Sequence, residues 1–166
     1  MRSATRSIIT SLGLALAAAG VQAAGTVAVS YVQPDKFADA GNTRHDVESN
    51  LKELTGHLEA LARRYLSDGQ KLNIEVLDID LAGEMRPSRR GGQDVRIVKG
   101  AADWPRIKLR YTLDSAGQPP LSGEKSLADM SYLQRAGGYS AKDPLRYEKR
   151  MLAEWFAAQF PTAAVK

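Results

Sequence analysis

Polar and apolar residues alternate along several short stretches of this chain, and such alternation is typical of strands in a half-buried sheet. The clearest case is PRIKLRYTL at 105–113, where every second residue from Ile107 is apolar and every second residue from Arg106 is polar. Four further stretches are predicted strands, each with glycine or proline close by: residues 26–32, 71–83, 94–99 and 121–127. The sequence therefore predicts a sheet of four or five strands.

Two longer segments show the helical period instead. In residues 43–68 the apolar side chains recur at spacings of three and four, which places them on one stripe of an amphipathic helix: Val47, Leu51, Leu54, Leu58, Leu61 and Tyr65. Thr43 and Asp46 match a capping box at its start. A second helix is predicted over 143–159, from the N-cap pair Asp143-Pro144 to a stop before Pro161.

The order of these elements is β-α-β-β-β-α. A strictly alternating strand has one face in the core and one in water, so the helices have one sheet face to cover. The predicted fold class is α+β, a two-layer sandwich with two helices packed on one face of a four- to five-stranded, mostly antiparallel sheet.

Residues 1–23 have the composition of a cleavable signal peptide. Arg2 and Arg6 precede an uncharged apolar run at 8–20, and small residues around Ala23 fit a cleavage site. There is no cysteine, so neither a lipid anchor at the new N-terminus nor a disulfide is possible. We expect residues 24–166 to form a single soluble domain in the periplasm.

The charge of the chain gives little support for nucleic-acid binding. Without Arg2 and Arg6, the 23 basic residues fall to 21 against 19 acidic ones, a net charge of +2. A nucleic-acid-binding domain of this size usually carries a strong basic excess. We therefore expect no nucleic-acid partner and no membrane-spanning segment after residue 23.

Asp78 and Asp80 interrupt an otherwise apolar strand. The apolar residues stand at even positions up to Val76 and at odd positions from Leu77, so a β-bulge at this point would keep them on one face. Both aspartates would then lie on the wet face, within reach of basic residues on neighbouring strands. The alternative is a divalent-metal site of Asp78, Asp80 and Glu84 in a hydrolase, although such ions need more oxygen ligands.

Few other residues suggest chemistry. His45 and His57 are twelve positions apart on one predicted helix and do not share a face, and no HExxH, GxSxG or phosphate-loop motif is present. The sequence therefore favours a protein without catalysis and predicts no cofactor and no metal. A small-ligand carrier, with a cavity between sheet and helices, stays open as a further alternative.

The strongest candidate for binding is a basic stretch. Between Glu84 and Arg110 the chain has eight basic residues against three acidic ones. We expect an unidentified envelope protein or anionic envelope component to bind the basic sheet face and the 84–94 loop. The candidate binding residues are Arg86, Arg89, Arg90, Arg96, Arg106, Lys108 and Arg110. The competing interpretation is a solvated sheet face whose charges guard against aggregation.

Several local strings resemble one family along most of the chain. They are DIDLAGE at 78–84, DVRIV at 94–98, DWPRIKLRY at 103–111, SLADMSYL at 126–133 and DPLRYEKRMLAEWF at 143–156. In this order they are similar to the exported proteobacterial domain-of-unknown-function family numbered three thousand and sixteen. The resemblance implies a single exported domain and brings no activity, ligand or catalytic residue with it.

The same strings contain polar and aromatic residues set among apolar ones. Buried groups of this kind need partners, so we expect a structural network. Its members are Asp78, Asp80, Trp104, Asp129, Glu148 and Trp155. Glu148 lies between Leu145 and Leu152 on the inner stripe of its helix, and we expect an arginine from the sheet, Arg106 or Arg96, to pair with it.

Overall fold

The computed structural model describes residues 25–86, 95–100, 102–135 and 138–161, so the expected signal peptide and the Arg89-Arg90 pair lie outside the described residues. The elements in chain order are β1 (Thr26–Tyr31), the 3-10 turn η1 (Pro34–Lys36), α1 (Arg44–Tyr65), β2 (Lys71–Asp80), β3 (Glu84–Arg86), β4 (Val95–Ile97), β5 (Arg106–Asp114), β6 (Leu121–Ala128) and α2 (Arg146–Gln159).

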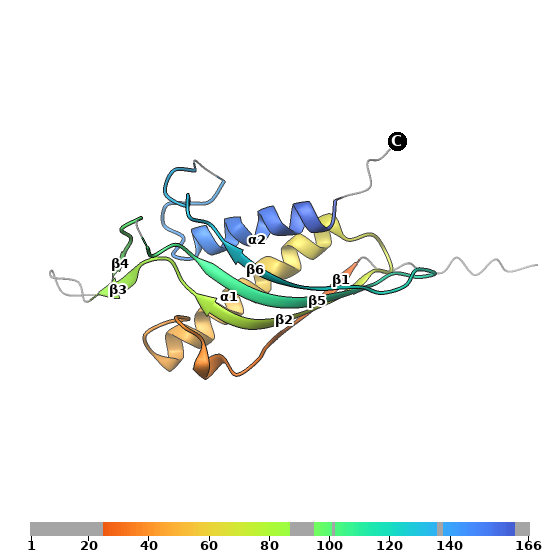
Figure 1. Cartoon of the computed structure of the whole chain (residues 1–166), viewed down its shortest axis with the longest axis horizontal. Coiled ribbons are helices and arrows are strands. Elements are labelled where there is room, and N and C mark those ends of the chain that lie inside the picture. Colours follow the sequence, from red (N-terminus) through yellow and green to blue (C-terminus); the bar gives the residue numbers. More distant parts are fainter. Residues whose placement is uncertain (1–24, 87–94, 101, 136–137, 162–166) are drawn as a thin grey trace, which may run out of the picture.

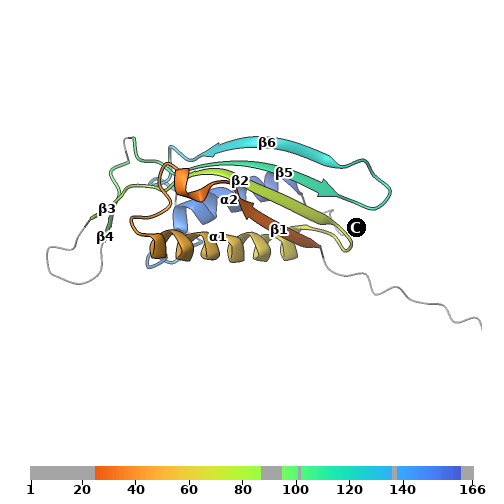
Figure 2. The same ribbon diagram turned by 90° about the horizontal axis from the view of Figure 1, so that it is seen from below.

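Four strands form one sheet in the order β1-β2-β5-β6. β1 runs parallel to β2 after the α1 crossover, and the other two pairings are antiparallel. Both helices lie against the same side of this sheet (Figure 2). The predicted α+β two-layer sandwich is confirmed.

The core lies between the sheet and the helices because the alternation of β2 and β5 gives the sheet one apolar face. Ile74, Leu109 and Tyr111 point to this face and are buried, as are Leu54 and Leu58 of α1. The polar residues between them on the strands face away from the helices. None of the helices among the described residues is both long and apolar enough to cross a membrane.

The register of β2 shifts between Val76 and Asp78, where the change of apolar parity predicts a bulge. Leu77 is the extra residue, and beyond it Asp78 lies opposite Lys108 and Asp80 opposite Arg106. The bulge lets Val76 and Ile79 both enter the core. It also places both aspartates beside basic residues of β5.

The stretch 94–99 was expected to join the main sheet, and this is wrong. β4 pairs only with β3, in a separate two-stranded hairpin that extends from one end of the molecule (Figure 1). The turn at Gly83 (φ 75°) explains why the chain leaves the sheet, and a Cβ there would lie 2.3 Å from the carbonyl oxygen of Ile97. Only glycine allows this close backbone approach.

The helix ends differ from the predicted ones by a few residues. α1 begins with the expected capping box, in which the Asp46 N–H donates to Thr43 Oγ1 and the Thr43 N–H donates to the Asp46 carboxylate. α2 begins at Arg146 rather than Pro144. The Asp143 side chain accepts instead from the Leu145 N–H at 2.8 Å, which stabilises a turn before the helix.

The capping box of α1 gives a direct test of this fold. Thr43→Ala should lower the free energy of unfolding by about 1 kcal/mol, because the Asp46 N–H loses its acceptor. Ser49→Ala, at an exposed position inside the same helix, is the matched control and should leave stability unchanged or slightly raised. Urea unfolding followed by circular dichroism measures both; equal stability of the two variants would contradict the assigned cap.

Candidate functional site

The three basic residues of β5 on the open sheet face are each paired with carboxylates. Arg106 Nη1 lies 2.5 Å from Asp80 Oδ2, and Lys108 Nζ lies 3.0 Å from Glu124 Oε1. Arg110 bridges Glu75 at 2.8 Å and Glu124 at 3.4 Å. These pairs are exposed and each contributes little stability. Together they neutralise the face, so an anionic partner binding there would have to displace bound carboxylates.

Two other predicted binding residues, Arg86 and Arg96, lie on the β3–β4 hairpin. Arg86 and Lys99 share the Glu84 carboxylate, at 2.7 and 3.5 Å. We expected Arg96 to face water together with the basic residues of the sheet, but it does not. Its position in β4 turns it toward α2, where its Nη1 lies 3.3 Å from Glu148 Oε1 and donates to the Pro144 carbonyl at 2.7 Å.

The three carboxylates of the alternative metal site each have protein partners. Asp78 accepts a hydrogen bond from the Ala38 N–H, Asp80 pairs with Arg106, and Glu84 pairs with Arg86 and Lys99. Across residues 25–86, 95–100, 102–135 and 138–161, no three His, Asp or Glu side chains are grouped so as to hold a metal ion.

At the first turns of α2, polar side chains from several parts of the chain come together. The four consecutive residues 147–150, YEKR, point in different directions, and each contacts a different part of the chain. Three of them are buried, although three of the four carry charge. We call this stretch the YEKR turn, and its contacts make it the candidate functional site.

Glu148 points toward the end of β2 and is fully buried. Its Oε1 accepts the Ala82 N–H at 2.8 Å and faces Arg96, whereas Oε2 has no hydrogen-bond partner among the described residues. Burial raises the pKa of this carboxyl, and the charge of Arg96 offsets the increase only in part. Arg106, the other arginine considered as its partner, lies on the opposite face with Asp80.

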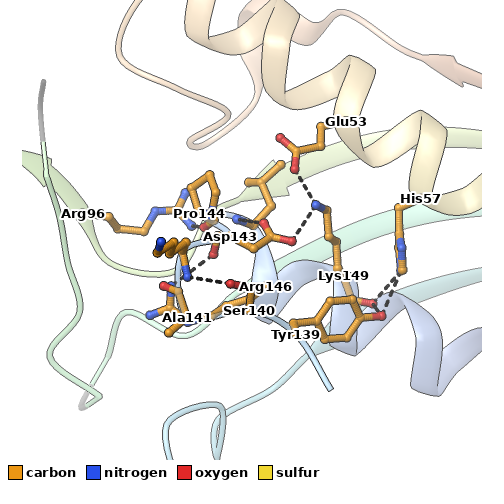
Figure 3. Close-up of polar contacts among 12 residues, drawn as sticks. Glu53, His57, Arg96, Tyr139, Ser140, Ala141, Asp143, Pro144, Arg146 and Lys149 are labelled. Atoms are coloured by element: carbon orange, nitrogen blue, oxygen red, sulfur yellow. Dashed lines mark hydrogen bonds and ion pairs between the residues drawn. The ribbon is translucent and has the colours of Figure 1, made fainter. Parts of the chain in front are cut away.

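Lys149 points to α1. Figure 3 shows its ammonium between the carboxylates of Glu53 and Asp143, with the Asp143 oxygen at 2.7 Å. Burial alone would lower the pKa of Lys149, but hydrogen bonds to Asp143 and Glu53 outweigh it and raise the pKa. The side chain is therefore an ammonium ion that joins two segments, and it is not a free amine that could act as a nucleophile.

The backbone carbonyl of Lys149 is the acceptor for a second contact with α1. His57 Nε2 lies 2.9 Å from this oxygen, so the neutral ring carries its proton on Nε2, and the Tyr139 hydroxyl donates to the same oxygen at 3.3 Å (Figure 3). Burial lowers the pKa of His57 below 6.5, which keeps the ring neutral. These contacts fix α2 against α1.

Tyr147 and Tyr132 form a small second core with Val98 packed against it, and their ring centroids are 4.7 Å apart. The Tyr132 hydroxyl donates to Asp103 at 2.9 Å, and burial with this carboxylate beside it raises the pKa of Tyr132 to about 12. Trp104 packs against this core, and the Arg106 guanidinium lies 4.7 Å from its ring centroid.

Arg150 completes the turn and holds the segment after β6. It donates to Asp129 at 3.1 Å and to the Tyr132 carbonyl at 2.6 Å. Asp129 is itself buried, so it needs this partner. Arg146, Arg150 and Arg135 line a cleft of about 190 Å³ beside this contact.

The last predicted network residue, Trp155, belongs to the main core. It is buried with Phe156, and its ring packs edge-on against Tyr111 at 5.8 Å. Between helices and sheet the core contains a cavity of about 10 Å³, lined by apolar side chains. Sites for organic ligands usually measure at least a few hundred Å³, so this space does not fit a carrier.

Sequence reasoning did not single out Lys149 or Arg146, and it considered His57 only as a metal ligand. On a helix, polar residues of this kind indicate a solvated face, and their partners lie up to 96 positions away in the chain. Glu148 was detectable because it interrupts an apolar stripe. Lys149 and Arg150, the two charged residues that follow Glu148 on the same turn, were the remaining signal in the sequence.

The sequence model of the family described as "Protein of unknown function (DUF3016)" matches residues 25–158. A curated protein, Ribosomal RNA large subunit methyltransferase H from Methylobacillus flagellatus, is 33% identical over 88 residues, which are 53% of this chain and 55% of that protein. The chain thus spans about half the length of this relative. No solved structure matches the chain.

Removal of the buried carboxylate should be costly. Glu148→Leu leaves the Ala82 N–H without an acceptor and the Arg96 guanidinium without its carboxylate, and we expect the free energy of unfolding to fall by about 3 kcal/mol. Glu148→Gln keeps an acceptor oxygen and should lose less. Glu59→Gln, at an exposed position of α1, is the control. A Glu148→Leu protein as stable as the native one in urea would rule out this role.

The pKa of His57 predicts a pH dependence. Since the folded protein keeps this ring neutral while the unfolded chain takes up a proton, the free energy of unfolding should fall as the pH drops below 6.5. His57→Gln can still donate to the Lys149 carbonyl and should show a shallower slope between about pH 8 and pH 5.5. His45→Gln should keep the native slope; identical slopes for all three proteins would contradict the assignment.

Proposed function

The chain belongs to the family described as "Protein of unknown function (DUF3016)", and we propose that it is an exported periplasmic protein without catalysis that binds the anionic surface of a membrane. The proposed contact is the end of the molecule that carries the β3–β4 hairpin. The proposal rests on an accumulation of exposed apolar side chains at that end, beside basic residues.

Six large hydrophobic side chains of the described residues are exposed, and four of them lie on two segments. Val95 and Ile97 are on β4, 47% and 38% exposed, and Met130 and Leu133 follow β6, 67% and 45% exposed. Single exposed hydrophobic residues are common, whereas a group indicates a contact surface. We call these four residues the apolar end.

The two segments of the apolar end adjoin each other. Leu133 lies against Gly100, three residues after β4 ends, with its Cδ1 2.8 Å from where a Cβ of Gly100 would be. The Gly100 N–H also donates to the Tyr132 hydroxyl at 3.2 Å. Both segments are attached through this contact and through the YEKR turn, which supports a single surface.

Basic residues of the hairpin supply the preference for an anionic surface. Arg86 and Lys99 are exposed and share one carboxylate, Glu84. The intervening loop adds Arg89 and Arg90 by sequence. Each Lys or Arg near an anionic membrane contributes about 1 kcal/mol, and shallow insertion of apolar side chains adds to this. The sheet face, with its paired charges, is not part of the proposed contact.

The similarity to the ribosomal RNA methyltransferase does not lead to a second proposal. It spans about half of each protein. The net charge of +2 expected for residues 24–166 also gives little attraction for a nucleic acid.

Vesicle binding tests the proposal. Purified protein comprising residues 24–166 should sediment with vesicles containing phosphatidylglycerol and not with phosphatidylcholine vesicles, and binding should weaken as salt is added. Val95→Ser with Ile97→Ser should reduce binding roughly tenfold by removing two inserting side chains. These residues are exposed, so stability should change little.

Leu121→Ser is the matched control. Leu121 is 46% exposed at the start of β6, which lies at the opposite end of the sheet from the hairpin (Figure 1). This variant should bind anionic vesicles like the native protein. Equal binding to both kinds of vesicle, no binding, or the same loss in both variants would overturn membrane binding through the apolar end. If the protein does not bind vesicles but position 95 crosslinks to another protein, the partner at the apolar end is a protein and not a membrane.

A further inference from the structure

We propose that the cleft between Arg135, Arg146 and Arg150 is a binding site for a small oxyanion, namely the carboxylate or phosphate group of a small molecule. The cleft measures about 190 Å³ and is lined by the first turn of α2 and by residues from 132–135 and 139–141. This arginine cleft is separate from the open sheet face and from Val95 and Ile97 of the apolar end.

Arg150 forms a rigid wall of the cleft. Its guanidinium is held by Asp129 and by the carbonyls of Tyr132 and Arg135, at 3.1, 2.6 and 2.9 Å, and the side chain is only 12% exposed. Its Nε is buried and has no acceptor among the described residues. A buried N–H of a charged group without an acceptor is costly. An anion in the cleft, which Arg150 lines, would lie close to this charged group.

Arg146 lies beside it with its charge uncompensated. No carboxylate of the described residues is within ion-pair distance of its guanidinium. Carbonyls hold it instead: Nη1 donates to Asp143 at 3.1 Å and Ala141 at 3.4 Å, while Nη2 donates to the Tyr147 hydroxyl at 2.7 Å. The group also lies 4.2 Å from the Tyr147 ring centroid. Such pre-positioning lowers the entropy cost of binding.

The charge balance leaves room for one negative group. Arg135 pairs with Glu154 at 2.5 Å and approaches Asp129, which is also the partner of Arg150. Three guanidinium groups therefore face two carboxylates. Guanidinium groups bind carboxylate and phosphate oxygens in a forked geometry, and the cleft is smaller than most sites for drug-sized ligands. These features fit a single oxyanion group.

Nuclear magnetic resonance of the intact protein tests this without a mutation. Titration with inorganic phosphate, and separately with acetate, at constant ionic strength should shift the Nε–Hε signals of Arg146 and Arg150 saturably, with a Kd in about the millimolar range or tighter. Arg110, an arginine of the sheet face already paired with two carboxylates, is the internal control and should not shift in this way. The titrant that saturates identifies the anion class.

Two variants complete the test by calorimetry. Arg146→Gln should weaken phosphate or acetate binding by roughly tenfold or more, and Arg146→Lys, which keeps the charge without the fork, should lose less. Arg110→Gln should bind like the native protein. If Arg146→Gln does not fold, the resonance titration decides alone. Shifts of Arg110 equal to those of Arg146, or no saturation with either anion, would overturn the proposal.

Discussion

The buried carboxylate of Glu148 is the group on which one end of this molecule depends. A carboxylate inside a protein is stable only with donors close to it, and here the donors come from two other segments, the end of β2 through Ala82 and the β3–β4 hairpin through Arg96. A ribbon of two three-residue strands has little stability alone. Its attachment to α2 through Arg96 explains how so short a hairpin has a defined position. The same interaction has a cost, since burial raises the pKa of Glu148.

The neighbouring residues of the YEKR turn extend this role. Apolar packing against the sheet is not directional, so it leaves the rotation of α2 about its axis weakly determined. Lys149 toward α1 and Arg150 toward Asp129 add directed contacts on two further sides. The start of α2 therefore holds together three separate parts of the chain: the β3–β4 hairpin, α1 and the segment after β6. The apolar end and the arginine cleft adjoin at the segment after β6, because Leu133 of the apolar end also lines the cleft.

Charge compensation distinguishes the surfaces of the molecule. On the open sheet face, cross-strand pairs such as Arg106 with Asp80 and Lys108 with Glu124 neutralise the basic residues. At the hairpin end, apolar side chains stand beside cations, and Arg146 has no carboxylate partner among the described residues. The number of basic residues along the sequence reveals neither the ion pairs of the sheet face nor the apolar side chains beside cations at the hairpin end. For this reason the proposed contact is at the hairpin end and not on the sheet.

The sequence by itself determined the elements of the main sheet, both helices, their layer and the bulge at Leu77, because these follow from the local period of apolar side chains and from short-range capping. It also marked Glu148, since one charge on an apolar stripe needs a partner. The choice of Arg96 over Arg106 as its partner, the separate hairpin and the arginine cleft were decided only by tertiary structure. Residues such as His57 and Lys149 meet across 92 positions, and a long-range polar contact leaves no periodic trace. Whether an arginine is paired depends on which distant carboxylate the fold brings within 4 Å of it.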